Sequence, residues 1–360
     1  MSKGRVLMAM SGGLDSSVAA MMLHQQGYEL VGITMKTWDY AGSGGTAKET
    51  GCCSLDSIHD ARQMAVEMGF PHYVIDLRGE FNELIITDFI HEYLRGRTPN
   101  PCVLCNTLIK WAALLRRADQ LGCHYIATGH YAQLKVENGR YILSKGLDQS
   151  KDQSYVLWGL TQDMLARTLF PLGKYSKAAI RQMAVDAGFS DIAQKRESYD
   201  ICFIPDEDYR SFLKTLVPGL AKKLNGGAFV NGQGEVIGTH DGYPFYTIGQ
   251  RKGLNLASGE PLYVKDILAD TNTIVLGKKQ ELMKHSFAIE NFNSIKFDTV
   301  KDGMRVMARI RYKEQGHPAV VYHEGELLRV QLDKPVAAIA PGQSAVLYAG
   351  DAVVGGGIIH

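Results

Sequence analysis

A glycine-rich turn near the beginning of the chain most constrains its fold. The turn, residues 11–17 (Ser-Gly-Gly-Leu-Asp-Ser-Ser), follows an apolar run at 5–10 and precedes a helical pattern at 16–26. Adjacent glycines permit backbone conformations that other residues avoid. Backbone N–H groups, hydroxyls and a helix start together favour phosphate. We therefore expect a strand–turn–helix unit that binds a nucleotide, although Asp15 and Ser11 are also ordinary helix-capping residues.

The first half of the chain alternates strand-like and helix-like segments. Strands are predicted at 5–10, 28–35, 73–77 and 124–128, and helices at 16–26, 54–68, 80–94 and 106–121. Such alternation is typical of a parallel, doubly wound α/β sheet. After about residue 205, short β-rich runs and turn signals dominate. We predict a catalytic domain at 1–205, a small central domain at 206–280 and a C-terminal β-barrel domain at 281–360.

The composition excludes several classes of protein. Hydrophobic residues make up 45% and charged residues 21% of 360 residues, a globular profile. No apolar run approaches the roughly 20 residues that cross a bilayer, and no signal peptide is evident, so we expect a cytoplasmic protein without a membrane partner. The net charge of +1 means that a nucleic-acid partner would have to use local basic clusters.

Six cysteines are too few for a disulfide-stapled secreted protein, so each must be core filler, metal ligand or reactive thiol. Cys105 lies near a predicted helix start, where the helix dipole and the nearby Arg95 and Arg97 favour thiolate. Cys202 is a second candidate, although a short apolar run around it is equally compatible with the core. Cys123 and the pair Cys52-Cys53 are predicted to be structural.

The glycine-rich turn is similar to the signature of the PP-loop ATP pyrophosphatases, and the whole chain resembles the tRNA-specific 2-thiouridylases. The resemblance implies an adenine nucleotide α-hydrolase-like first domain. The matching segments run from residue 11 to residue 343: they are 11–17, 51–54, 96–106, 127–132, 151–155, 200–204, 246–254, 309–312 and 341–343.

This resemblance assigns binding roles to individual residues. It implies ATP binding, with Mg²⁺ held in part by Asp15, and a tRNA substrate. The implied ATP-binding residues are Ala9, Met10, Ser11, Gly12, Gly13, Leu14, Asp15, Ser16, Met35 and Gly129. The implied contacts to the target base or to tRNA are Asn100, Pro101, Cys102, His130, Lys151, Asp152, Gln153, Arg311, Tyr312 and Gln343. Strand alternation would also place Arg309 on the same face as Arg311.

The resemblance also implies a mechanism. ATP adenylates the C2 oxygen of the wobble uridine, Cys202 carries a persulfide sulfur supplied by a donor protein, and Cys105 is the partner nucleophile. Some relatives carry Asp at the position of Cys102, which leaves the acid/base role of this thiol open. Cys102, Cys105 and Cys202 could instead hold a [4Fe–4S] cluster. Two other classes remain open: another ATP-dependent ligase or amidotransferase with a PP-loop, and a non-catalytic RNA-binding protein.

Overall fold

The computed structural model describes residues 3–38, 54–195, 201–204, 208–256 and 259–360. It consists of two compact units, each built from several chain segments. The first unit contains residues 1–85, 102–207 and 351–353, and the second contains residues 86–101, 208–350 and 354–360. Cys52 and Cys53 lie outside the described residues.

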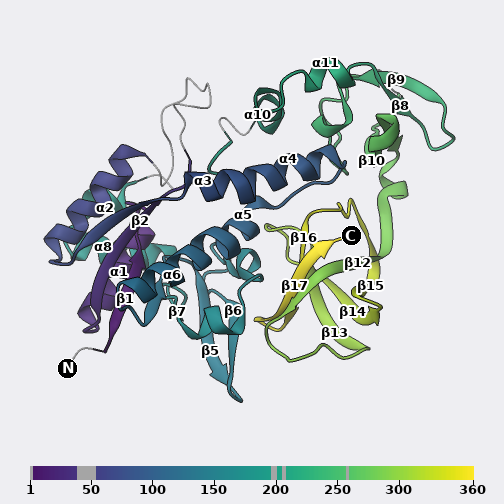
Figure 1. The fold of residues 1–360 in the computed structure, drawn as a ribbon. Coiled ribbons are helices and arrows are strands. Elements are labelled where there is room, and N and C mark those ends of the chain that lie inside the picture. The colour runs from purple at the N-terminus through teal and green to yellow at the C-terminus, as the bar shows by residue number, and fades with distance from the viewer. Residues whose placement is uncertain (1–2, 39–53, 196–200, 205–207, 257–258) are drawn as a thin grey trace. The chain divides into compact units, whose positions relative to one another are not determined.

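A five-stranded parallel sheet forms the centre of the first unit (Figure 1). The four strands predicted from the sequence are present, each within one residue of its expected bounds. A two-residue strand, β7, was missed because it is too short to show a periodic pattern. In spatial order the strands are β3 (His72–Asp76), β2 (Glu29–Lys36), β1 (Arg5–Ala9), β4 (Tyr125–Ala127) and β7 (Thr168–Leu169).

Helices pack along this sheet and close its core. Val6 and Met8 of β1 lie with Val18 of α1 and Ile180 of α8 in one buried apolar cluster. The α-helices assigned wholly or mainly to the first unit are α1 (Leu14–Gln25), α2 (Leu55–Glu67), α3 (Arg78–Phe81), α5 (Pro101–Leu104), α6 (Ala112–Gln120), α7 (Gln162–Ala166), α8 (Lys177–Asp186) and α9 (Ser190–Ala193). The fold class predicted for this part of the chain is confirmed.

Two helical runs contain π-helical segments that the sequence pattern did not predict. The segment η2 (Asn82–Ile86) separates α3 from α4 (Thr87–Leu94), and η3 (Cys105–Trp111) separates α5 from α6. The second run begins at Pro101, five residues earlier than predicted, which suits a proline because its missing N–H is not needed in a first turn. π-Helical turns are rare and often occur at functional sites.

A β-hairpin follows strand β4. Its strands are β5 (Ala132–Glu137) and β6 (Arg140–Lys145), and a short 3-10 helix, η4 (Ser154–Leu157), comes after them. Asn138 and Gly139 both have positive φ, 51° and 79°. Two such residues form the type I′ turn that matches strand twist, so the Asn-Gly signal in the sequence correctly marks this hairpin.

The second unit contains a small four-stranded sheet and several short helices. The strands, in spatial order, are β10 (Tyr263–Leu268), β11 (Thr273–Gly277), β8 (Gly227–Val230) and β9 (Val236–His240). The helices are α4, α10 (Tyr209–Leu216) and α11 (Leu220–Leu224), with 3-10 turns η6 (Tyr243–Phe245), η7 (Ala269–Thr271) and η8 (Lys279–Leu282). Across the described ranges, no helix has the length and apolarity to span a membrane.

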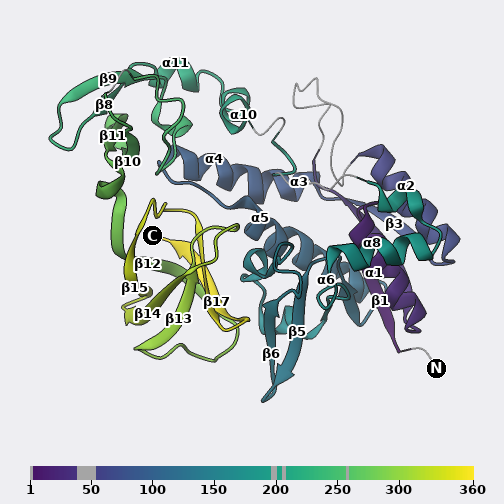
Figure 2. The ribbon, with the colours of Figure 1, turned by 180° about the vertical axis from the view of Figure 1, so that it is seen from behind.

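The end of the chain forms a closed six-stranded barrel, drawn in green to yellow in Figures 1 and 2. Pairing of β12 with β17 closes it, and alternating side chains such as Val321 and Val330 fill its interior. The strands, in spatial order, are β12 (Met283–Ser294), β15 (Leu327–Ala337), β14 (His317–Glu324), β13 (Met304–Arg309), β16 (Ser344–Ala349) and β17 (Ala352–Ile359). The predicted C-terminal barrel is confirmed, whereas the predicted domain boundaries stay predictions.

Candidate nucleotide and thiol site

The glycine-rich turn joins β1 directly to α1, and one of its two glycines is sterically required. Gly12 has φ +67°, and a Cβ there would lie 2.1 Å from the backbone oxygen of Ser57. Gly13 is the N-cap of α1 with φ −97°, a conformation open to any residue. The conformational freedom expected of both glycines is therefore used at Gly12 alone.

Hydroxyl groups organise the turn from within. The Ser16 Oγ accepts a hydrogen bond from the backbone N–H of Ser11 at 3.1 Å and donates to the carbonyl of Gly13 at 3.1 Å. The Ser11 Oγ lies 3.2 Å from the Ser16 Oγ. The Ser17 hydroxyl is buried, and no partner for it occurs among the described residues. The turn is thus pre-ordered at a helix start, as a phosphate-binding loop requires.

Asp15 forms an ion pair that the sequence did not reveal. Lys177, the first residue of α8, is buried and places its Nζ 2.8 and 2.9 Å from the two carboxylate oxygens. The Tyr131 hydroxyl donates to Asp15 Oδ1 at 2.7 Å. Most of the acceptor capacity of this carboxylate is therefore occupied. In this arrangement Asp15 does not fit the predicted role of Mg²⁺ ligand.

A second lysine holds the turn from another side. The Nζ of Lys195 donates to the Gly12 carbonyl at 2.9 Å and forms an ion pair with Asp60 on α2. Lys177 and Lys195 are far from the turn in sequence, and a lysine in a helix or after one normally suggests a solvated side chain. No local signal could have identified them. Two ammonium groups beside the turn make its surroundings favourable for polyphosphate.

Gly129, predicted to let ATP approach closely, has another reason to be glycine. A Cβ at this position would lie 2.9 Å from the backbone of Asp15 and Ser16. The missing side chain therefore lets the first turn of α1 pack directly on the end of β4. The nearby Met10 is buried, and its carbonyl accepts from the Thr34 hydroxyl at 2.9 Å. Met35 lies near the end of β2 and Ala9 ends β1 at the same carboxyl edge of the sheet.

The structure separates the environments of Cys102 and Cys105. Cys102 is in the first turn of the helical run, and Cys105 is the fifth residue of that run and is buried. The helix start therefore acts on Cys102 more directly than on Cys105, contrary to the sequence expectation. Cys102 is exposed on one side but crowded by protein on others. This desolvation raises the pKa of its thiol, and the charge of Lys110 only partly opposes the shift.

His130 is held as a neutral ring. Its Nδ1 lies 2.8 Å from the Thr128 hydroxyl, and its ring packs against Trp111 and Phe170. Desolvation, aided by the charge of Lys110, lowers the pKa of His130 to about 3. At neutral pH this side chain can donate from one nitrogen and accept at the other, but it cannot supply positive charge to an RNA phosphate.

The segment that carries Cys202 packs on the same unit as the turn. Phe203, adjacent to Cys202, lies against Phe81 and Trp38, with ring centroids 5.5 and 6.1 Å apart. Phe81 ends α3, which contacts η3, the segment that begins at Cys105. The two cysteine-bearing segments thus both contact α3. The exposed thiol of Cys202 contrasts with the buried thiol of Cys105.

The three cysteines do not fit the predicted iron–sulfur cluster in this structure. Cys102, Cys105 and Cys202 all lie in the described part of the chain. Within that part, no three His, Cys, Asp or Glu side chains come together in an arrangement that could hold a metal ion. A [4Fe–4S] cluster needs three or four convergent thiolates.

Lys151, Asp152 and Gln153, predicted to contact tRNA, follow the β5–β6 hairpin. Asp152 is buried, and its Oδ1 accepts from the backbone N–H groups of Gly146 and Ser154 at 3.2 and 3.0 Å. The Gln153 side-chain oxygen accepts from the Tyr131 N–H at 2.9 Å. These two side chains therefore order the loop, and Lys151, which precedes them, is half-buried.

The expectation that Arg309 and Arg311 share a strand face is wrong. Strand β13 ends at Arg309, whose guanidinium is buried over the Tyr348 ring and donates to the Tyr312 carbonyl. Arg311 lies beyond the strand, is exposed, and donates to the carbonyl of Ala338 at 2.6 Å. The strand pattern was extended too far because the residues after 309 turn away from the barrel wall. Arg311 and Tyr312 remain exposed candidates for RNA contact.

The loop 97–101, which contains Asn100 and Pro101, belongs to the second unit. Arg97 is not available as a source of positive potential, because it forms ion pairs with Glu92 and Glu290. Gln343 donates its side-chain amide to two backbone carbonyls of this loop. The site residues predicted from the sequence are thus divided between two units.

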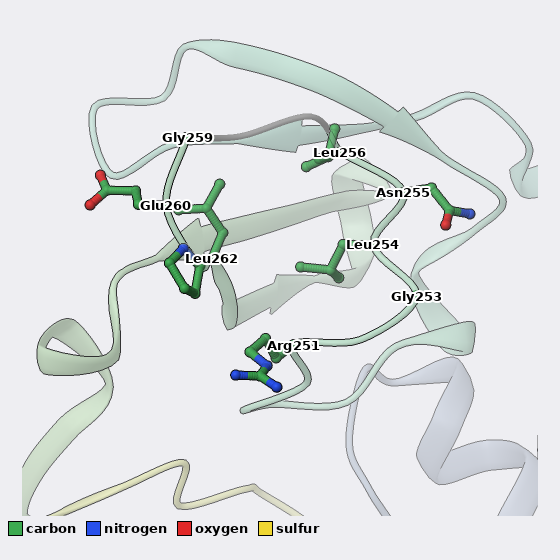
Figure 3. Close-up of a pocket in the computed structure, with 9 residues that line it drawn as sticks. Arg251, Gly253, Leu254, Asn255, Leu256, Gly259, Glu260 and Leu262 are labelled. Atoms are coloured by element: carbon green, nitrogen blue, oxygen red, sulfur yellow. The ribbon is translucent and has the colours of Figure 1, made fainter.

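An open pocket in the second unit has a different lining (Figure 3). It includes part of the segment 246–254, one of those that carry the family resemblance. None of the predicted ATP-binding, cysteine or tRNA-contacting residues lines it. Its lining consists of Arg251, Gly253, Leu254, Asn255, Leu256, Gly259, Glu260, Pro261 and Leu262.

Three family models match consecutive parts of the chain. A tRNA methyl transferase HUP domain matches residues 4–206, a tRNA methyl transferase PRC-barrel domain matches 211–278, and an aminomethyltransferase β-barrel domain matches 284–359. Together they account for the parallel sheet, the small middle sheet and the C-terminal barrel.

Curated relatives match over the full length. A tRNA-specific 2-thiouridylase MnmA of Amoebophilus asiaticus is 57% identical over all of this chain and 96% of its own. Proteins of the same name from Cytophaga hutchinsonii and Salinibacter ruber are 55% and 56% identical, each over 99% of this chain and over 97% and 94% of their own.

Proposed function

This chain belongs to the family of tRNA-specific 2-thiouridylases, and we propose that it replaces the C2 oxygen of the wobble uridine of tRNA by sulfur at the expense of ATP. The single observation that best supports this proposal is the pre-ordered turn at the start of α1, which shares one compact unit with Cys105 and Cys202. We place the reaction in the cytoplasm, with tRNA and a persulfide-donating protein as partners.

The turn 11–17 would bind the pyrophosphate portion of ATP. Its backbone N–H groups and the start of α1 favour negative charge, and Lys177 and Lys195 lie close by. Ala9, Met10, Leu14, Met35 and Gly129 lie in or around this strand–turn–helix unit, where adenosine would bind. Each of these roles rests on the family resemblance, and Ala9 and Met35 also lie at the carboxyl edge of the sheet.

The first chemical step would be adenylation. The C2 oxygen of the uridine attacks the α-phosphorus of ATP, pyrophosphate leaves, and the oxygen becomes part of a good leaving group. The loop 97–101, here called the target-base loop, would hold the flipped base through Asn100 and Pro101, together with Cys102, which follows the loop. Flipping costs little in an anticodon loop that is already single-stranded.

The second step would be sulfur transfer through a covalent intermediate. The terminal sulfur of a Cys202 persulfide attacks C2, and AMP departs with the original oxygen. Cys105 thiolate then attacks the Sγ of Cys202, which breaks the S–S bond, leaves sulfur on C2 and forms a Cys105–Cys202 disulfide. An external thiol reductant must restore both cysteines. The raised pKa of Cys102 suits a thiol that stays protonated and donates a proton more than one that acts as a nucleophile.

Recognition of tRNA outside the base would use three further side chains. Lys151 and Arg311 would contact phosphates, and Tyr312 could stack or pack against ribose. His130, held neutral, would contribute hydrogen bonds alone. Asp152 and Gln153 would act through the loop that they order, and Gln343 through the loop to which it donates.

The proposal is tested with tRNA transcript, ATP and a low-molecular-weight persulfide, followed by mass spectrometry of digested nucleosides. We expect sulfur in place of oxygen on one uridine. Cys105→Ser and Cys202→Ser should each abolish thiolation while pyrophosphate release persists.

Cys123→Ser is the matched control, because Cys123 is a buried thiol that precedes β4, with its Sγ 3.9 Å from the Leu121 carbonyl. It should leave thiolation intact. Full activity of both the Cys105 and Cys202 variants would overturn the persulfide scheme.

A further inference from the structure

A turn of the C-terminal barrel holds the target-base loop through one side chain, that of Gln343, and one backbone carbonyl, that of Pro341. The Gln343 Nε2 donates to the carbonyl oxygens of Thr98 at 3.0 Å and Pro99 at 2.9 Å. The backbone N–H of Thr98 donates in turn to the Pro341 carbonyl at 2.8 Å. Three hydrogen bonds thus join two consecutive loop residues to one turn, although nearly 250 residues separate them in sequence.

The turn that makes these bonds is itself fixed. Gly342 has φ +87°, and a Cβ there would lie 2.9 Å from the Thr98 oxygen and 3.0 Å from its nitrogen. The Gly342 N–H donates to the Ile359 carbonyl, and the Ile359 N–H donates to the Gln343 carbonyl, both at 2.8 Å. Glycine is therefore required for the loop to approach, and β17 holds the turn in place.

Ion pairs reinforce the same attachment. Arg97, at the start of the loop, forms ion pairs with Glu92 near the end of α4 and with Glu290 on β12. Burial alone would lower the pKa of Arg97, but the hydrogen bonds and charges of Glu290 and Glu92 outweigh it and raise the pKa. Its guanidinium therefore stays charged and fixes the loop at the end opposite Asn100.

We propose that Gln343 is a positioning residue that sets the target-base loop for sulfur transfer, and that it does so through Thr98 and Pro99. An amide nitrogen carries two hydrogens, and the two carbonyls use both. Asn100 and Pro101 follow directly, so a shift at 98–99 is transmitted along the backbone to the residues expected to hold the uridine. This inference rests on the proposed function, and it adds a positioning role to the tRNA contact that the resemblance implies for Gln343.

A positioning role and an RNA-contact role predict different kinetics. Misplacement of the base would reduce the rate of a reaction that requires close alignment, and a shift of about 1 Å can cost up to about a hundredfold. Loss of a uniform RNA contact would instead raise KM and leave kcat unchanged. Gln343→Glu replaces two donors with acceptors that face two carbonyl oxygens, and Gln343→Met removes the donors at nearly constant length.

The test measures thiolation of tRNA by the variants Gln343→Glu and Gln343→Met. The matched controls are Gln331→Glu and Gln331→Met, because Gln331 is an exposed glutamine on β15 of the same barrel. We expect kcat to fall about tenfold or more for the Gln343 variants, with KM for tRNA within about twofold of wild type. Both control variants should match wild type. Retained kcat, or a raised KM with unchanged kcat, would overturn the proposal.

Hydrogen–deuterium exchange provides a second measurement that does not depend on activity. Faster exchange at the Thr98 and Asn100 amides in the Gln343 variants, with the rest of the barrel unchanged, supports the anchor. Unchanged exchange there contradicts it. If wild-type protein forms no 2-thiouridine, the proposed function fails by itself, and the exchange result still decides whether Gln343 holds the loop.

Discussion

The turn 11–17 and the target-base loop are both held by side chains that come from distant parts of the sequence, but the chemistry of the two attachments differs. Lys177 and Lys195 hold the turn, each with a carboxylate as a partner. Gln343 holds the target-base loop through neutral donors on carbonyls. Ammonium groups can exchange a carboxylate for a phosphate without losing a charge partner, whereas amide–carbonyl bonds mainly fix geometry. The comparison suggests one site built to receive an anion and another built to hold its shape.

The largest effect on activity is expected from a side chain added at Gly12, which tests whether the turn requires glycine there. In Gly12→Ala the new Cβ would overlap the Ser57 carbonyl at 2.1 Å, in addition to the strain of a positive φ, about 1–2 kcal/mol. We expect ATP-dependent pyrophosphate release to become undetectable. Gly27→Ala is the control, because Gly27 has φ +87° and open space around it, so it adds the strain without the overlap. Equal activity of the two variants would contradict the steric argument.

Removal of one ammonium group should cost stability as well as activity. Lys177→Met leaves the Asp15 carboxylate without its cation, and we expect about 2 kcal/mol lower free energy of unfolding. This expected loss is smaller than the roughly 3–5 kcal/mol that breaking a fully buried ion pair costs, because the Asp15 side chain is 35% exposed. Chemical denaturation measures the change.

The double variant Asp15→Asn/Lys177→Met sharpens this result. If the pair stabilises through its charges, the double variant should be more stable than Lys177→Met alone, while ATP binding stays weak. Strictly additive losses would show that the two side chains act independently.

The target-base loop should respond less to loss of its ion pairs. Arg97→Met removes contacts to Glu92 and Glu290 that are only partly exposed, and we expect a loss of about 1–2 kcal/mol in unfolding free energy. Arg305→Met is the control, because the Arg305 side chain is 73% exposed in its pair with Asp333 and should cost at most about 0.5 kcal/mol. A smaller loss for Arg97 than for Arg305 would contradict the attachment described for the loop.

The smallest effect at neutral pH is expected at His130. The fold lowers the pKa of His130 from 6.5 to about 3, so the unfolded chain takes up a proton first as the pH falls below 6.5. The stability that the neutral ring contributes is complete above that pH and is lost progressively toward pH 3. By about pH 5 the loss should reach at most about 2 kcal/mol.

Thermal unfolding between neutral pH and about pH 5 should therefore show a smaller decrease in Tm for His130→Gln than for wild type. His59→Gln, at an exposed position on α2, should follow the wild-type curve. Parallel curves for His130→Gln and wild type would show that the His130 ring does not control acid sensitivity.

The sequence by itself determined the features that depend on neighbouring residues. The strand–turn–helix unit around Gly12, the Asn138-Gly139 hairpin and the strand–helix alternation are local patterns, so they could be predicted closely. The local sequence marked Cys105 as a candidate thiolate, but the pairing of Cys105 with Cys202 came from the resemblance, because the neighbours of Cys202 do not distinguish a reactive thiol from a core residue.

Only the tertiary structure decided which distant side chains complete each site. Lys177 lies 162 residues from Asp15, and Gln343 lies 245 residues from Thr98. Periodicity and turn signals carry no information about such pairs, because these contacts arise only when sheet and barrel strands have paired. The same reason explains why the burial of Arg309 was missed, because it depends on the Tyr348 ring that packs against it.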